Sequence, residues 1–190
     1  MNVFGIVVEG PRDAVVYATI IRRIRSDVHV IPRPCGGITA LLDRFAGWLK
    51  YFQYQQQQID KVLVIRDAGG KDPQALERDL AERLEKSHCD PPFPVHFYAI
   101  KSMLETWLLA DEHAVSKVAE SRRRHGKVKA TNKQLEGLLD PKPSFLAMLS
   151  QVDLPANDKV YEEVAAAADL DRIAERCPRL AEFREQVHAC

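Results

Sequence analysis

The chain has 190 residues, which is enough for one domain with a substantial core. Its 46% hydrophobic and 28% charged residues are typical of a soluble globular protein, and its 27 basic and 27 acidic residues cancel, which excludes a general positive field that would draw the molecule to nucleic acid. The start has no basic leader and no apolar stretch approaches the roughly 20 residues of a membrane span, so we expect a cytoplasmic protein without membrane contact.

Short apolar strands alternate with amphipathic helices in the first half of the chain. We expect strands at residues 3–8, 28–32, 61–66 and 95–100. A helix opens at Pro11, a second runs from Ile38 to Phe52, and a third follows Asp72. This alternation predicts an α/β fold with about four mainly parallel strands flanked by helices.

The strand signals stop after Lys101, and helical segments fill the rest of the chain. We expect one helix at residues 102–120. Further helical pieces are NKQLEGLL, PSFLAMLSQV, DKVYEEVAAAADL and DRIAERCPRLAEFREQV, punctuated by prolines. We therefore expect an α/β core at residues 1–112 and a helical extension at residues 113–190, packed on the core as a single compact unit.

Three apolar runs lead to acidic side chains. VFGIVV ends on Glu9, VLVI reaches Asp67 through Arg66, and FYAIKSML leads to Glu105. The carboxyl ends of parallel strands open onto one crevice, so these acids are expected to converge although they are distant in sequence. Because Mg²⁺ prefers oxygen ligands and keeps several waters, one or two carboxylates and a phosphate oxygen suffice to hold it. The pattern predicts a site for Mg²⁺ or Mn²⁺.

The loop DAGGKD after the third expected strand adds two candidates. Asp72 is a candidate metal ligand, although its place before Pro73 and a helix fits an N-cap equally well. Lys71, together with Arg66 and Lys101, is a candidate to offset negative charge in a transition state.

Glu105 lies within SMLETWLLA, next to residues that supply a buried helix face. A charge near such a surface is costly unless a cation or a pair with Lys101 or Arg66 compensates it, and exposure on the opposite helix face is the alternative. Asp111 is expected either to hold a residue of the site in position or to cap a helix.

Three motifs of the chain suggest a family. EGPRD after the first strand, the Asp-led loop after the third and ETWLLAD after the fourth resemble the Toprim-like domains of the OLD nuclease group. The chain is more closely similar to an uncharacterised bacterial family of small stand-alone Toprim-like proteins, whose pattern DPKPSFL, Tyr161 and DLDRIAERCPRLAEF also fit. The resemblance covers nearly the whole chain, and ETWLLAD is its most specific element.

This resemblance implies a Toprim fold, in which a Glu and an Asp pair bind Mg²⁺ or Mn²⁺ for phosphodiester chemistry. By position, Glu9 matches the Toprim glutamate, Asp67 the first aspartate and Glu105 the later acidic residue. Gly69 stands where the usual second aspartate would be, and Asp72 would have to substitute from further along the loop. The resemblance also implies a separately encoded ATPase partner of the AAA or ABC kind, in phage defence or DNA repair.

Two other interpretations remain open. Gly69 favours a noncatalytic Toprim-like subunit that binds a metal or a partner. Asp67 after the third strand and Lys101 after the fourth loosely resemble a phosphoacceptor receiver domain, although that version lacks an acidic pair after the first strand and a fifth strand.

One segment of the sequence concentrates positive charge. Arg122, Arg123, Arg124 and Lys127 are candidates to grip a nucleic-acid backbone, since phosphate contacts position a substrate without reading its sequence. The alternative is that these side chains are simply solvated. No aromatic residues interleave with them to strengthen the case.

Several other kinds of site are disfavoured by spacing. The four cysteines show no CxxC pattern, which argues against structural zinc and a disulfide framework, and the six histidines show no HExxH pattern. The AGGKD loop lacks the first glycine and the Ser or Thr of a phosphate-binding loop, which argues against an ATP site of that kind.

Overall fold

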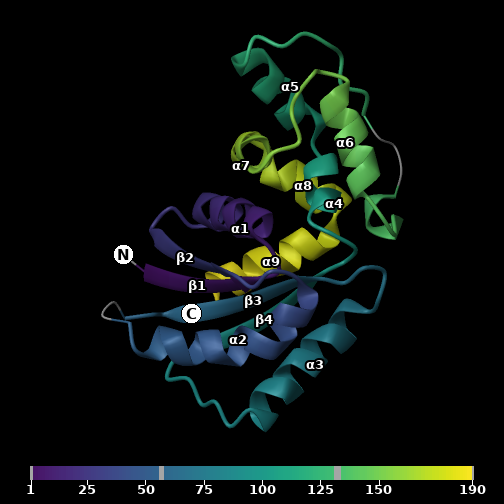
Figure 1. Ribbon diagram of the computed structural model, residues 1–190. Coiled ribbons are helices and arrows are strands. Elements are labelled where there is room, and N and C mark those ends of the chain that lie inside the picture. Colours follow the sequence, from purple (N-terminus) through teal and green to yellow (C-terminus); the bar gives the residue numbers. More distant parts are fainter. Residues whose placement is uncertain (1, 56–57, 131–133, 190) are drawn as a thin grey trace.

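A computed structural model describes residues 2–55, 58–130 and 134–189 of the chain. Four strands form one sheet in the order β2-β1-β3-β4, and every neighbouring pair is parallel (Figure 1). The strands are β1 (Asn2–Val8), β2 (Val28–Pro34), β3 (Lys61–Asp67) and β4 (Val95–Ile100). The expected α/β class and parallel sheet are confirmed.

Helices connect the strands and then continue to the end of the described chain. The connecting helices are α1 (Pro11–Ile24), α2 (Ile38–Gln53) and α3 (Pro73–Lys86). After β4 come α4 (Glu105–Leu109), α5 (Glu112–Ser121), the 3₁₀ helix η1 (Leu135–Gly137), α6 (Lys142–Ser150), α7 (Asp158–Ala167), α8 (Leu170–Arg176) and α9 (Pro178–His188). Within the described ranges, no helix is long and apolar enough to cross a membrane.

Helices cover both faces of the sheet (Figure 1). Along β1, Phe4 and Ile6 join a core that α1 and the later helices complete, whereas Val3 and Val7 join a second core with α2 and α3. Side chains of a strand alternate between the two faces of the sheet, and here both faces are buried. This double burial explains why the strands read as nearly continuous apolar runs.

Close packing of α2 on the sheet depends on one glycine. A Cβ at Gly5 of β1 would lie 2.8 Å from ring atoms of Phe52, which is fully inside the second core. Any larger residue at this position would displace the C-terminal end of α2, because real Cβ atoms do not come this close to a packed ring.

The C-terminal helices complete the core on the α1 face. Phe183 of α9 lies 4.9 Å from the ring centroid of Tyr98 on β4 and 5.4 Å from that of Trp107 on α4. Tyr17 of α1 meets Trp107 edge-on at 6.1 Å. One continuous core therefore joins the first 112 residues to the helices that follow them.

Both edges of the sheet carry features that discourage further strand pairing. At the β4 edge, the N–H of Ala99 donates to Oε1 of Glu77 at 2.9 Å, and the carbonyl of Ala99 accepts from Nη2 of Arg179, also at 2.9 Å. Arg179 and Glu77 form an ion pair with each other as well. The β2 edge contains Pro32 and Pro34, which have no N–H to donate.

The single helix expected at residues 102–120 is wrong. The chain forms two helices, α4 and α5, with a break at Ala110 and Asp111. Asp111 has the non-helical torsions φ −130° and ψ 86°, and its carboxylate accepts from the N–H of His113 at 3.2 Å. An N-cap aspartate starts a new helix here, because its side chain satisfies an amide that would otherwise lack a partner.

Two other expected helical pieces also differ from the structure. The segment NKQLEGLL was expected to be helical; residues 132–133 lie outside the described ranges, and the remainder contains only the short η1. DRIAERCPRLAEFREQV forms two helices instead of one piece, because Pro178 begins α9 directly after Cys177.

Candidate functional site

Glu9 and Asp67 come together at the carboxyl end of the central strands. Glu9 directly follows β1, Asp67 is the last residue of β3, and these two strands are neighbours in the sheet. The backbone N–H of Asp67 donates to Oε1 of Glu9 at 3.0 Å. The carbonyl of Glu9 accepts from the N–H groups of Gly36 and Gly37 at 2.8 and 2.7 Å, which ties the loop after β2 to the same place.

A third carboxylate joins them from the first turn of α1. Oδ2 of Asp13 accepts from the N–H of Gly10 at 2.8 Å, which holds this side chain at the start of the helix. Burial raises the pKa of Asp13 to about 6, and the charges of Glu9 and Glu105 add to the rise while the Gly10 N–H opposes it. Asp13 is therefore close enough to the other acids for their charges to raise its pKa.

The pKa values of the two central acids are raised as well. Burial raises the pKa of Asp67 well above its ordinary value, and the charges of Asp13, Glu9 and Glu105 raise it further. Burial also raises the pKa of Glu9, against the Asp67 N–H and the positive charge of Arg66, which lower it. Several carboxylates crowded into a partly desolvated place repel one another, and a cation would relieve this repulsion.

Glu105 is buried at the N-terminus of α4, with 6% of its surface exposed. Its Oε1 accepts a 3.2 Å hydrogen bond from the hydroxyl of Tyr161 on α7. The guanidinium of Arg12 lies over the Tyr161 ring at 4.1 Å and pairs with Asp158 at 3.0 Å. The helical extension thus supplies the polar partner of Glu105, in place of Lys101 or Arg66, and the burial of Glu105 excludes the alternative of exposure on the opposite helix face.

The hydroxyl of Tyr17 is buried and has no hydrogen-bond partner among the described residues. Tyr17 is on α1, one turn after Asp13, and only 1% of its surface is exposed. Burial raises the pKa of Tyr17 well above its ordinary value, and the charge that adds most to this is that of Asp67. A buried polar atom without a partner is unusual in a folded protein.

The loop after β3 lies open beside the acids. Gly69 and Gly70 adopt positive φ angles of 54° and 84°, and nothing lies within 4 Å of where a Cβ of Gly69 would be. Asp72 caps α3 by accepting from the N–H of Gln74 at 3.2 Å, so the predicted capping role is confirmed. Lys71 and Asp72 are both exposed, and their catalytic and metal-binding roles stay predictions.

The donor set at this place consists of carboxylate oxygens, which suit a hard divalent cation. Among the residues that the structure describes, no group of three or more His, Cys, Asp or Glu side chains is arranged to hold a metal ion. Mg²⁺ is commonly bound through only one or two carboxylates, with water and substrate phosphate completing its shell. Glu9 and Asp67 fit that smaller requirement by their chemistry and their proximity.

Ion pairs partly neutralise the basic segment. Arg122 forms a two-pronged contact with Glu163 at 2.7 and 2.9 Å, and Arg124 pairs with Asp153 at 2.7 Å. Arg123 and Lys127 are exposed. Two of the four predicted nucleic-acid contacts thus already have acidic partners within the chain.

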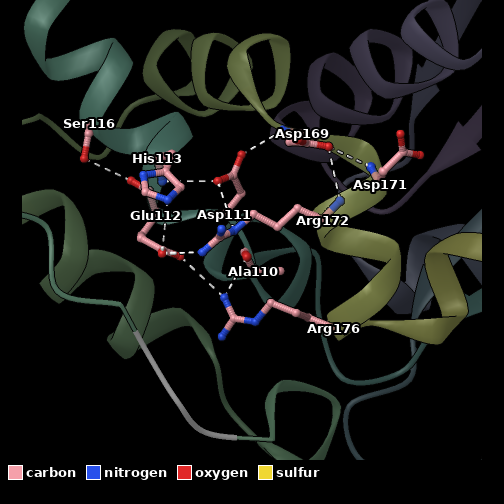
Figure 2. Close-up of polar contacts among 9 residues, drawn as sticks. All are labelled: Ala110, Asp111, Glu112, His113, Ser116, Asp169, Asp171, Arg172 and Arg176. Carbon is pink, nitrogen blue, oxygen red and sulfur yellow. Dashed lines mark hydrogen bonds and ion pairs between the residues drawn. The ribbon is translucent and has the colours of Figure 1, made fainter.

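A polar network fixes the position of α4 relative to the C-terminal helices (Figure 2). Besides capping α5, the carboxylate of Asp111 accepts from the N–H of Asp169 at 2.7 Å. Arg172 of α8 contacts both Asp111 and Glu112, and Arg176 donates to the carbonyl of Ala110 at 2.7 Å. Asp111 is therefore a helix cap, which is one of the two roles expected for it. It also anchors the pair α4 and α5, of which α4 carries Glu105.

Sequence reasoning missed four residues around the acids. Asp13 and Arg12 lie within the EGPRD motif, and the spacing of four between Glu9 and Asp13 at the start of a helix is a signal that identifies Asp13. Tyr17 follows at the same spacing but reads as an ordinary core aromatic. Tyr161 is 56 residues from its partner Glu105, and no local pattern links the two.

Comparison with known proteins gave one family. A family model described as a domain of unknown function (DUF4276) matches residues 8–188, a range that includes every acid of the site. Neither the curated proteins nor the solved structures gave a match.

Proposed function

The chain belongs to the DUF4276 family, whose description assigns no activity, and we propose from the site itself that it is a metal-dependent phosphodiesterase or nuclease of the Toprim type. The observation that carries this proposal is the meeting of Glu9 and Asp67 at the carboxyl end of the sheet, joined by the 3.0 Å hydrogen bond. The crowding of Asp13 and Glu105 against them supports it, because a cation would offset their mutual repulsion.

In this proposal Glu9 and Asp67 would hold Mg²⁺ or Mn²⁺, with Glu105 of α4 as a further candidate ligand. A bound ion of this kind polarises a phosphoryl group and lowers the pKa of bound water. Glu9 orients the attacking water and takes its proton. Arg66, which is near Glu9, and Lys71 on the open loop offset the charge that develops on the phosphoryl oxygens.

Access to the site supports a phosphate-containing substrate. Nothing lies within 4 Å of the positions where Cβ atoms of Gly36, Gly37 and Gly69 would be, so both loops expose their backbone beside the acids. A backbone without side chains leaves room for a phosphate to come close to the acids, although the N–H groups of Gly36, Gly37 and Gly69 already donate to carbonyls of the chain.

We propose further that a separately encoded ATPase of the AAA or ABC kind works with this chain, in phage defence or DNA repair. The resemblance of EGPRD and ETWLLAD to OLD-group proteins is the basis of this proposal. The balanced net charge and the paired Arg122 and Arg124 are consistent with it, since a partner would then supply much of the grip on nucleic acid.

A second candidate is a noncatalytic subunit that binds a metal or a partner. Gly69 at the usual position of the second aspartate favours it, because Asp72 is already engaged as a helix cap. This version keeps the cation at Glu9 and Asp67 but not the cleavage.

Incubation with nucleic acid tests the proposal. Supercoiled DNA, single-stranded DNA and tRNA are each incubated with the protein and Mg²⁺ or Mn²⁺, with and without the product of any neighbouring ATPase gene. We expect cutting that Glu9→Gln and Asp67→Asn reduce by about 100-fold or more, as for other groups that act on the transition state. Glu82→Gln, at an exposed position on α3, is the matched control and should cut like the wild type.

The other outcomes separate the two candidates. Thermal stabilisation by Mn²⁺ that Glu9→Gln abolishes, without any cutting, supports the noncatalytic subunit. Absence of both cutting and stabilisation contradicts both.

A further inference from the structure

Tyr17 has a hydroxyl whose position the core does not explain. The ring is well packed, edge-on to Trp107 at 6.1 Å and tilted against Phe183 at 6.4 Å. The hydroxyl, however, has no hydrogen-bond partner among the described residues, although it is inaccessible to solvent. A phenylalanine would make the same ring contacts without burying an unpaired polar atom, which costs free energy.

Asp67 lies on the sheet face that α1 covers, because side chains alternate along β3 and Leu63 and Ile65 join the same core as Tyr17. After burial, the contributions that raise the pKa of Tyr17 come from Asp67, then Asp13, Glu9 and Glu105. All four belong to the acidic site. The hydroxyl is therefore buried on the sheet face where Asp67 lies, and of the four acids Asp67 adds most to the rise in the pKa of Tyr17.

The geometry points to Tyr17 as a residue that helps to position the carboxylate of Asp67, by donating a hydrogen bond to it when a divalent cation occupies the site. This inference rests on the proposed function. Carboxylates that ligate a metal are commonly held in turn by a hydrogen bond from behind, which fixes their orientation. Asp67 is on β3 and Tyr17 on α1, so the bond would join the sheet to the helix that also carries Asp13.

A comparison with Tyr98 shows why this hydroxyl is unusual. Tyr98 is fully buried in the same aromatic cluster, but its hydroxyl donates to the carbonyl of Arg179. The charges near it are those of Arg179, Glu182, Glu77 and Glu136, none of which belongs to the site. Tyr98 therefore provides a matched control with the same residue type, burial and ring neighbours.

The experiment compares Tyr17→Phe and Tyr98→Phe in the full chain, with two measurements on each. Without metal, Tyr17→Phe should raise the melting temperature by about 2–4 °C, because the unpaired hydroxyl is removed. Tyr98→Phe should lower it by a similar amount, because a satisfied hydrogen bond is lost. In a calorimetric titration with Mn²⁺ alone, Tyr17→Phe should weaken binding by about tenfold or more, whereas Tyr98→Phe should bind like the wild type.

Each possible result decides a different question. If the wild type binds Mn²⁺ and Tyr17→Phe binds it with the same affinity, the role of Tyr17 is disproved and the proposed function stands. If Tyr17→Phe lowers the melting temperature of the metal-free protein, the hydroxyl already has a structural partner and the inference is wrong. If the wild type binds no Mn²⁺, the proposed cation site fails and the inference fails with it.

Discussion

The backbone N–H of Asp67 donates to the carboxylate of Glu9 over 3.0 Å, so the residue after β1 is fastened to the last residue of β3. The bond orients the Glu9 side chain across the end of the sheet. Glu9 therefore has a structural role as well as a proposed catalytic one, and substitutions can separate these two roles.

Glu9→Gln should keep the fold intact, and Glu9→Ala should weaken it. Glutamine retains an oxygen that can accept from the Asp67 N–H and removes one charge from a crowded group, so the free energy of unfolding should be unchanged or higher. Alanine leaves that N–H without its acceptor, at a cost of about 1–3 kcal/mol. Urea denaturation of the metal-free variants measures both, and equal stability of the two would show that the hydrogen bond contributes nothing.

Asp13 should make the metal-free protein less stable as the pH rises from about 4 to about 6. Its pKa is about 6 in the folded chain against 3.8 as its ordinary value, so between these values the folded state binds more protons than the unfolded state. The stability that Asp13 contributes is fully present at pH values below its unfolded-state pKa. It is lost, by up to about 3 kcal/mol, as the pH rises through its folded-state pKa.

Asp13→Asn tests this pH dependence. Asparagine can still accept from the N–H of Gly10 but cannot titrate, so the variant should be more stable than the wild type at neutral pH and should show a flatter stability profile from pH 4 to 6. Melting temperatures across that range measure the effect. Superimposable profiles for the two proteins would count against the raised pKa.

Asp111→Ala should be strongly destabilising, by about 2–4 kcal/mol. The substitution removes the N-cap of α5 and the acceptor of the Asp169 N–H, and it leaves Arg172 without one of its two acidic partners. Asp171→Ala is the control, because its carboxylate is 80% exposed, and it should change stability by no more than about 0.5 kcal/mol. Chemical denaturation compares them, and a mild effect at Asp111 would mean that the network in Figure 2 is dispensable.

Arg123 and Lys127, which have no ion pair among the described residues of the basic segment, should contribute to nucleic-acid binding. Arg123→Ala with Lys127→Ala should weaken binding to single-stranded DNA and lower the slope of its salt dependence by about 0.7 for each residue. Lys86→Ala, exposed on α3, is the control. Fluorescence anisotropy at several salt concentrations gives the slopes, and equal slopes would remove this segment from the proposed interface.

Much of the sheet and part of the site could be predicted from the sequence because both depend on local patterns. A strand buried on both faces must be apolar throughout, so its bounds are visible, and parallel strands bring Glu9 and Asp67 to the same edge. The break at Asp111 was missed because the apolar spacing continues through it, while the capping hydrogen bond that divides the helix depends on one side chain.

The remainder of the site depends on long-range packing, which no local pattern encodes. Tyr161 reaches Glu105 only because α7 packs on α1. Arg12 of α1 is held at this contact by its ion pair with Asp158, the first residue of α7. The unpaired hydroxyl of Tyr17 is equally invisible in a sequence, since a tyrosine among apolar helix residues resembles any core aromatic. Such features can be identified only in the three-dimensional structure.

The Glu77 and Arg179 pair at the edge of β4 has a consequence for assembly. Together these side chains occupy the outward N–H and carbonyl of Ala99 much as a fifth strand would, so a partner cannot extend the sheet there without first displacing two charged groups. The prolines of β2 interrupt the ladder on the other side. A protein that associates with this chain should therefore dock against its helices or loops, and should leave the four-stranded sheet as it is.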